Sequence, residues 1–255
     1  MSHIEPLVID HTQSVAIIAI NHSEHRNALT TEHRVALRDQ LQVLACDERI
    51  SAVVLTSKAS AFSAGQDLFE AKDFKPERIP SWIEEHMALY REILKFPKAT
   101  VAAIDGCCVG AGLQIAMLCD LRVGSDRSFF ALPELDDAIP CILGTWTLLD
   151  VIGRGRTTEM LFTNRRVYAP EALSWGILNK VVSADGILPE AVRYAQLIGK
   201  KSALAFRLTK QRITQLMLEG SDALTIHAIF AHMQAFATDE PKKAMEIFLE
   251  RGRQG

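Results

Sequence analysis

Two glycine-containing segments decide the fold of this chain: Ala61-Phe62-Ser63-Ala64-Gly65-Gln66-Asp67 and Asp105-Gly106-Cys107-Cys108-Val109-Gly110-Ala111-Gly112. Each follows a short apolar run typical of a buried strand, residues 52–56 for the first and 101–104 for the second. Such turns let another molecule approach the backbone closely and leave backbone N–H groups without partners. Two N–H groups that converge on one carbonyl oxygen form an oxyanion hole. The segments therefore predict enolate chemistry rather than a metal or phosphate site.

Strand and helix patterns alternate around these segments in the first half of the chain. Strands are also predicted at residues 15–20, 121–123 and 129–132, and helices at 30–45, 80–94 and 113–119. This alternation indicates an α/β core with parallel strand pairing. The polar stretch 69–80, which is bounded by proline, is expected to be a mobile loop beside the site.

The second half of the chain is predicted to be mostly helical. One late strand is expected at residues 177–182. The predicted helices cover residues 145–152, 157–162, 170–175, 189–198, 203–218, 223–236 and 241–250.

The composition is that of a globular protein without a nucleic-acid or membrane partner. The 255 residues are 48% hydrophobic and 23% charged, and the net charge is −3. No apolar run approaches the roughly 20 residues of a membrane span, and no basic leader precedes the first strand, so we expect a cytoplasmic protein. The five cysteines lack CxxC spacing, and His22 and His25 lack a third ligand at zinc-like spacing, so neither disulfides nor a metal site are expected.

Five motifs in a fixed order resemble the crotonase superfamily, the enoyl-CoA hydratase/isomerase family, over residues 7–251. They are Arg26-Asn27-Ala28-Leu29, the segment 61–67, the segment 106–120, Phe130-Ala131-Leu132-Pro133-Glu134, and Ala237-Thr238-Asp239-Glu240. The resemblance implies a crotonase-like (ClpP/crotonase) spiral of ββα repeats in an acyl-CoA-binding core, residues 1–200. It further implies a C-terminal helical trimerisation region, residues 201–255, and assembly as a homotrimer or hexamer. The implied substrate is an acyl-CoA thioester, with no cofactor beyond the CoA moiety.

The resemblance also assigns roles to individual residues. The backbone N–H groups of Gln66 and Ala111 match the oxyanion donors, and Glu134 matches a catalytic carboxylate. The positions that match those along the CoA path are Arg26, Ala28, Ala64, Asp67, Leu68, Phe248 and Arg251.

Gln114 departs from the family pattern. Typical hydratases of this family use two carboxylates to activate water, and Gln114 stands where the first is expected, while Glu134 supplies the second. A glutamine amide can hold a water molecule but cannot take its proton. One carboxylate is enough to move a double bond, because the same group takes a proton from C2 and returns it at C4. We therefore favour enoyl-CoA isomerisation with Glu134 as the single acid and base.

The loop after Glu134 is a second departure. Ile139-Pro140-Cys141 comes one residue earlier than the family's Ile-Pro-Gly, so the aim of Glu134 is open. The neighbours Asp136 and Asp137 could act as acid or base, or could form a solvated turn. His86 and Tyr90 could face the pocket, although a surface or partly buried position is expected for such a pair.

Several alternative functions stay open at this point. Hydration of an enoyl-CoA is the first, and another enolate reaction such as decarboxylation, dehalogenation or C–C bond hydrolysis is the second. A catalytically weak acyl-CoA-binding scaffold is the alternative outside enzymology.

Overall fold

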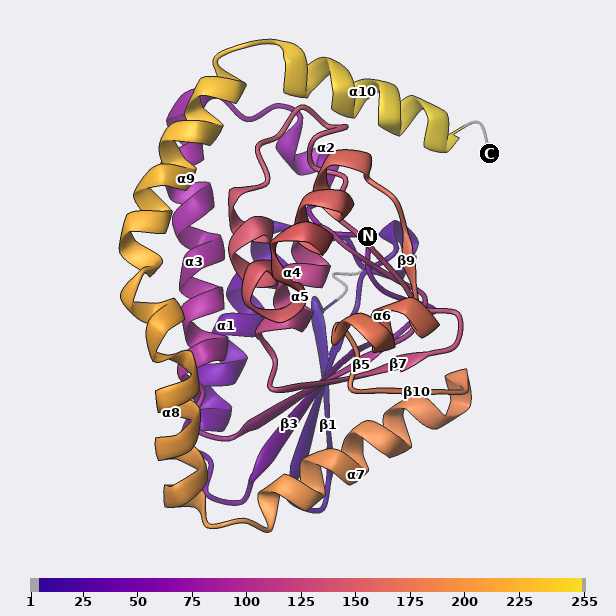
Figure 1. The fold of residues 1–255 in the computed structure, drawn as a ribbon, viewed down its shortest axis with the longest axis vertical. Helices are drawn as coiled ribbons and strands as arrows, with labels where there is room; N and C mark the ends of the chain where they lie inside the picture. Colours follow the sequence, from indigo (N-terminus) through magenta and orange to yellow (C-terminus); the bar gives the residue numbers. More distant parts are fainter. Residues whose placement is uncertain (1–4, 254–255) are drawn as a thin grey trace.

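The computed structural model describes residues 5–253, and its central layer is a six-stranded sheet (Figure 1). The strand order is β1-β2-β3-β5-β7-β10, in which β1 runs antiparallel to β2 and all other neighbours are parallel. The sequence patterns did not predict β1, a half-buried edge strand with the polar pair Asp10 and His11. The strands span Leu7–Thr12 (β1), Val15–Ile20 (β2), Ala52–Ser57 (β3), Ala99–Ile104 (β5), Leu121–Ser125 (β7) and Lys180–Val182 (β10).

A second sheet of four short strands lies beside the first, in the order β4-β6-β8-β9. Its strands span Ala61–Ser63 (β4), Cys107–Val109 (β6), Phe129–Ala131 (β8) and Val167–Tyr168 (β9). Three times in succession the chain passes through a strand of the first sheet, a strand of the second and then a helix. This repeat confirms the predicted spiral of ββα units. The sequence predicted that both glycine-containing segments are turns. In the structure each of them also contains a strand, β4 in the first segment and β6 in the second.

Ten α-helices and three short 3₁₀ helices are present in the described residues. The α-helices are Thr31–Cys46 (α1), Leu68–Ala71 (α2), Ile79–Lys95 (α3), Ala111–Leu118 (α4), Ile142–Thr163 (α5), Ala169–Trp175 (α6), Ile187–Gly199 (α7), Ala203–Glu219 (α8), Ser221–Phe236 (α9) and Glu240–Arg253 (α10). The 3₁₀ helices are Ser23–His25 (η1), Pro76–Arg78 (η2) and Ala184–Gly186 (η3).

One prediction was wrong, that of a loop after Asp67, and one was confirmed, that of two helices between residues 145 and 162. The stretch 69–80, expected to be a loop, contains most of α2 and all of η2, because Asp67 caps α2 by accepting a hydrogen bond from the Glu70 N–H. The two helices expected at residues 145–152 and 157–162 are confirmed as the two halves of α5, which are separated at Gly153, where φ is 76° and ψ is 165°.

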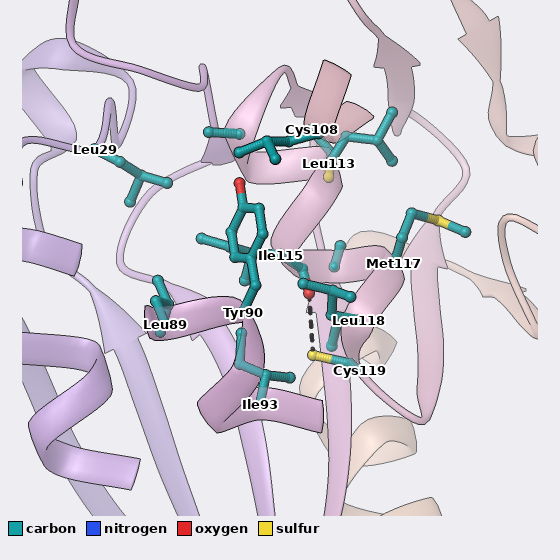
Figure 2. Packing of buried hydrophobic residues seen from close by; sticks show 14 of the residues in the cluster. Leu29, Leu89, Tyr90, Ile93, Cys108, Leu113, Ile115, Met117, Leu118 and Cys119 are labelled. Carbon is teal, nitrogen blue, oxygen red and sulfur yellow. Dashed lines mark hydrogen bonds between the residues drawn. The ribbon is translucent and has the colours of Figure 1, made fainter. Parts of the chain in front are cut away.

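The core lies on both faces of the large sheet. Helix α7 covers one face with Ile187, Ala191 and Ala195 (Figure 1). On the other side α4 is buried along its whole length, which explains its almost uninterrupted apolar sequence. Figure 2 shows side chains of α4 packed together with Leu89, Tyr90 and Ile93 of α3. Gln114 is the one residue of α4 with a polar side chain, so its burial demands hydrogen-bond partners.

The C-terminal helices α8 and α9 run along α3 (Figure 1). The buried Lys210 of α8 donates to Asp120 Oδ2 at 2.8 Å, and Arg91 of α3 donates to the Asp222 carboxylate of α9 at 2.7 Å. The expected border between residues 200 and 201 falls between α7 and α8, and the division into two functional regions stays a prediction. None of the helices in the described part of the chain has both the length and the apolar character needed to cross a bilayer.

Candidate active site

The two glycine-containing segments, distant in sequence, lie against each other at the start of α4. Gly65 has a φ of +96°, and a Cβ added there would lie 2.9 Å from the carbonyl oxygen of Val109 and 3.5 Å from the nitrogen of Ala111. Gly110 has a φ of +52°, and a Cβ added there would lie 3.8 Å from the Cα of Gly65. Only glycine combines these dihedral angles with such close packing. The glycines therefore bring the peptides of Gln66 and Ala111 close together.

The N–H groups of those two peptides take no part in the backbone hydrogen bonds that hold their neighbours. The Leu29 N–H donates to the Gly65 oxygen at 2.7 Å and the Asp67 N–H donates to the Leu29 oxygen at 3.2 Å, so the intervening Gln66 N–H is unused by this pairing. Ala111 is the first residue of α4, where a helix leaves its N–H groups unpaired and its dipole favours negative charge. These are the two N–H groups predicted to form the oxyanion hole, and that role stays a prediction.

The side chain of Gln66 is anchored away from this N–H pair. Its Oε1 accepts from the Arg34 guanidinium at 2.7 Å and from Trp82 Nε1 at 3.2 Å, while its Nε2 donates to Glu70 at 3.1 Å. Arg34 is buried and also donates to the backbone oxygen of Leu29 at 3.0 Å. These side-chain contacts fix the orientation of the Gln66 peptide.

Glu134 lies beside the same turn. Its Oε1 accepts from Gln114 Nε2 at 2.9 Å and would be 3.5 Å from a Cβ added to Gly110. Its Oε2 is inaccessible to solvent and has no hydrogen-bond partner. Burial raises the pKa of Glu134 to about 7, a nearby Asp137 raises it further, and hydrogen bonds from the backbone, Cys141 and Gln114 oppose this rise. The carboxyl group can therefore be both protonated and ionised near neutral pH.

Gln114 is held from its other side by Tyr90. The Tyr90 hydroxyl donates to Gln114 Oε1 at 2.7 Å and lies 3.3 Å from His86 Nδ1. His86 and Tyr90 are 4% and 0% exposed, so the expectation of a surface or partly buried position was wrong. Figure 2 shows Tyr90 rising from α3 with its hydroxyl directed toward Cys108 and Leu113. The spacing of four residues between Trp82, His86 and Tyr90 was a sequence signal for one helix face that turns toward the site.

The shortened loop after Glu134 is closed by a backbone hydrogen bond. The Ile139 N–H donates to the Glu134 oxygen at 2.8 Å, and Ala138 adopts a left-handed φ of 56° that closes the turn. Asp136 is exposed and accepts from Asn164, whereas Asp137 is half-buried and burial raises its pKa to about 6. The two aspartates therefore differ: Asp136 belongs to a solvated turn, and Asp137 is a second titratable carboxyl near Glu134.

Most candidate CoA-binding residues come together along the segment that follows β2. The Ala64 N–H donates to the Arg26 oxygen at 3.0 Å, which sets the stretch containing Arg26 and Ala28 beside the stretch containing Ala64 and Asp67. Leu68 follows at the start of α2. Phe248 and Arg251 are exposed on α10, which packs across α2 (Figure 1).

His22, His25 and Asp67 form a group of three potential metal ligands that sequence spacing did not reveal. Their ligand atoms lie within 4.8 Å of one another. However, the rings of His22 and His25 stack nearly parallel, 4.5 Å apart. Two stacked imidazoles cannot both direct an in-plane lone pair at one ion, and Asp67 already caps α2 with its other oxygen. The residues as arranged do not fit a metal ion.

Comparison with known proteins agrees with this geometry. The model of the enoyl-CoA hydratase/isomerase family matches residues 10–254. A short-chain-enoyl-CoA hydratase from Clostridium acetobutylicum is 29% identical over 247 residues, which cover 96% of this chain and 95% of that protein.

Two solved structures have the same fold. An enoyl-CoA hydratase from Bacillus halodurans superposes with a TM-score of 0.87 at 24% identity, covering 95% of this chain and 99% of that one. A methylmalonyl-CoA decarboxylase in complex with 2-nitronate-propionyl-CoA superposes with a TM-score of 0.85 at 23% identity, covering 98% and 97%.

Proposed function

The chain belongs to the enoyl-CoA hydratase/isomerase family, and on that premise we propose that it moves the double bond of a 3-enoyl-CoA thioester to the 2-position. Glu134 is the single acid and base of this reaction. The N–H groups of Gln66 and Ala111 hold the thioester oxygen.

The observation that carries the proposal is the hydrogen bonding of Gln114. Its only acceptor atom, Oε1, is occupied by the Tyr90 hydroxyl, and its Nε2 donates to Glu134. A water molecule held for addition to a double bond must give its proton to a base, and the Gln114 amide is not a base. One carboxyl group, Glu134, therefore remains beside the N–H pair.

Each step balances with that single group. Ionised Glu134 takes a proton from C2, the C–H electron pair moves toward the thioester, and negative charge collects on the oxygen between the two N–H groups. The protonated Glu134 then returns the proton to C4 as the double bond shifts. The charge exists mainly in and after the transition state, so the N–H groups lower the barrier more than they tighten binding, and each is worth on the order of 10²–10³ in rate.

The same proposal covers CoA binding. Arg26, Ala28, Ala64, Asp67 and Leu68 hold the CoA moiety, and Phe248 and Arg251 approach it from α10. No cofactor beyond CoA is needed.

The proposed assembly is a homotrimer or hexamer in the cytoplasm. The support for it is a set of apolar side chains on α8 and α9 that are more than half exposed in one chain. They are Leu204, Leu208, Ile213, Leu216, Ile226 and Phe230.

Hydration of a 2-enoyl-CoA is the second candidate. It is favoured by the name of the relative from Clostridium acetobutylicum and by Asp137, a half-buried carboxyl whose pKa is raised to about 6 near Glu134. Decarboxylation is the activity in the name of the methylmalonyl-CoA decarboxylase with the same fold. No residue described in this chain favours that reaction over the other two.

The test is turnover of the purified protein and of Glu134→Gln on a 3-enoyl-CoA and a 2-enoyl-CoA, followed by the absorbance of the conjugated thioester. We expect fast isomerisation of the 3-enoyl substrate, its loss in the variant, and little hydration. Rapid hydration by the wild type with slow isomerisation would overturn the proposal in favour of the second candidate. Tight binding of both thioesters without turnover would favour a scaffold.

A further inference from the structure

His86 and Tyr90 are buried polar groups to which the proposed reaction gives no task. They lie on consecutive turns of α3 and connect, through Gln114, to the carboxyl group of Glu134. Burial of polar groups is costly unless they are hydrogen bonded, and His86 Nε2 is left without a partner. The burial of His86 with an unpaired nitrogen therefore indicates a role other than packing.

We propose that Tyr90, supported by His86, is a positioning residue that fixes the amide orientation of Gln114 and thereby stabilises the ionised form of Glu134. This inference is tested in two ways. The test by the products of the reaction rests on the proposed function, whereas the test by the ionisation of Glu134 does not.

The direction of each hydrogen bond follows from the chemistry of the four groups. An amide oxygen only accepts, so the Tyr90 hydroxyl must donate to Gln114 Oε1. The Tyr90 oxygen is then free to accept, and His86 Nδ1 lies 3.3 Å away as the donor. That tautomer leaves Nε2 of His86 as a bare lone pair, in agreement with its lack of a partner. The chain of bonds therefore runs in one direction, from His86 to Glu134.

Neither His86 nor Tyr90 changes its charge near neutral pH. Burial lowers the pKa of His86 well below its usual value, so the ring stays neutral. Burial raises the pKa of Tyr90, so the hydroxyl stays protonated. The pair is thus a fixed polar support rather than a source of protons.

The orientation of Gln114 selects the charge state of Glu134. With Oε1 held by Tyr90, the amide presents N–H to the carboxylate, which stabilises the ionised form. With the amide turned over, two oxygens would meet, and only a protonated Glu134 could form the hydrogen bond. The turned amide would also offer an oxygen that can accept from a water molecule. Removal of the Tyr90 hydroxyl should therefore raise the pKa of Glu134 and permit more hydration.

Other charged or titratable groups also act on this network, and the Tyr90 variant leaves them in place. Asp137 from the same loop and Cys141 from the start of α5 face Glu134. Arg34 from α1 acts on both Tyr90 and His86, and Arg78 and His232 act on His86.

The experiment compares Tyr90→Phe and His86→Phe with the matched control His232→Phe. His232 is an equally buried histidine that packs on Trp82, as His86 does, but its Nδ1 bonds to Ala228 within its own helix. The protonated-carboxyl infrared band of Glu134, assigned with Glu134→Gln, is titrated in each protein without substrate. The ratio of hydration to isomerisation and the pH profile of kcat/KM are measured on the same samples.

We expect Tyr90→Phe to raise the pKa of Glu134 by about one unit, the size of one charge-assisted hydrogen bond. The acid limb of kcat/KM should move with it, and the hydration ratio should rise several-fold. His86→Phe should move both readouts in the same direction by less, and His232→Phe should move neither.

An unchanged pKa of Glu134 in Tyr90→Phe would overturn the inference, even if the enzyme is an isomerase. Equal shifts in Tyr90→Phe and His232→Phe would also overturn it, because they would report a general loss of packing. A raised pKa in an enzyme that does not isomerise would support the positioning role while refuting only the proposed reaction.

Discussion

Replacing Glu134 with glutamine should stabilise the folded protein at alkaline pH while it removes activity. The reason is that the fold buries a carboxyl group whose ionised form lacks a partner for one oxygen. The variant keeps the shape of the side chain and its contact with Gln114, but it cannot ionise. Stability and turnover are therefore expected to change in opposite directions.

The size of the effect follows from the pKa of Glu134, which the fold raises from 4.5 to about 7. Between these values the folded state binds more protons than the unfolded state, so the free energy of unfolding falls as pH rises through this window. A separation of about 2.5 units at about 1.4 kcal/mol per unit gives a loss of about 3 kcal/mol by pH 8. The variant has no such loss. Its amide N–H replaces the unpaired Oε2 and costs about 1 kcal/mol at every pH.

The expected difference in unfolding free energy therefore runs from close to zero at pH 5 to about 2 kcal/mol in favour of the variant at pH 8. For a chain of this length each kcal/mol corresponds to about 2–4 °C in Tm. Thermal melts of both proteins at pH 5, 6, 7 and 8 measure the change, at one protein concentration so that any assembly contributes equally.

A control of opposite sign is available in Glu190. Its hydrogen bonds with Arg193 and Lys180 lower its pKa to about 2, so Glu190→Gln should lose stability at neutral pH and recover it only as the pH falls toward that value. A Tm difference between Glu134→Gln and wild type that is the same at pH 5 and pH 8 would refute the reasoning, because Glu134 would then not titrate near neutrality.

Three further predictions concern the second carboxylate, the N–H pair and the assembly. Gln114→Glu should raise hydration of a 2-enoyl-CoA at least about tenfold, since it supplies a second general base beside Glu134; unchanged hydration in the absorbance assay would contradict this. Gly65→Ala should lower kcat by roughly 10²–10³, because its Cβ would lie 2.9 Å from the Val109 oxygen and displace the Gln66 N–H, whereas Gly155→Ala, with nothing within 4 Å, should not. Ile213→Asp with Leu216→Asp should reduce the mass in light scattering to that of one chain, and Val43→Asp, equally exposed on α1, should leave it unchanged.

Local sequence patterns carried most of the fold. Strands such as β3 and β5 are short apolar runs next to glycine turns, and α1 begins after Thr30, whose side chain accepts a hydrogen bond from the His33 N–H. The interruption at Gly153 was also predicted, because a glycine within a helical pattern indicates a break or a kink. The three-residue strands β4 and β6 are too short for any periodicity, and only their pairing across the second sheet defines them.

The close approach of the two glycine-containing segments was predictable from sequence because glycine turns restrict the backbone itself, whereas the choice of the Gln66 and Ala111 N–H groups rests on the family resemblance. The support around it was not, because it depends on side chains that meet through tertiary packing. Arg34 reaches Gln66 from α1, and Trp82 reaches it from α3, although neither residue type marks an active site on its own. The same holds for Tyr90, whose spacing with His86 is equally common on helices that face only the core.

The replacement of the first family carboxylate by Gln114 is a change in a network rather than at one position. A glutamate there would be a second buried acid beside Glu134, and like charges at such a distance raise each other's pKa. The amide removes that repulsion and donates a hydrogen bond instead, so in the proposed reaction Glu134 alone cycles between acid and base. That cycle requires an amide that cannot turn over, and a neutral tyrosine held by a neutral histidine provides this at any pH near 7. In this proposal His86 and Tyr90 of α3 therefore act together with Gln114. The three side chains set the proton affinity of one carboxyl group, that of Glu134.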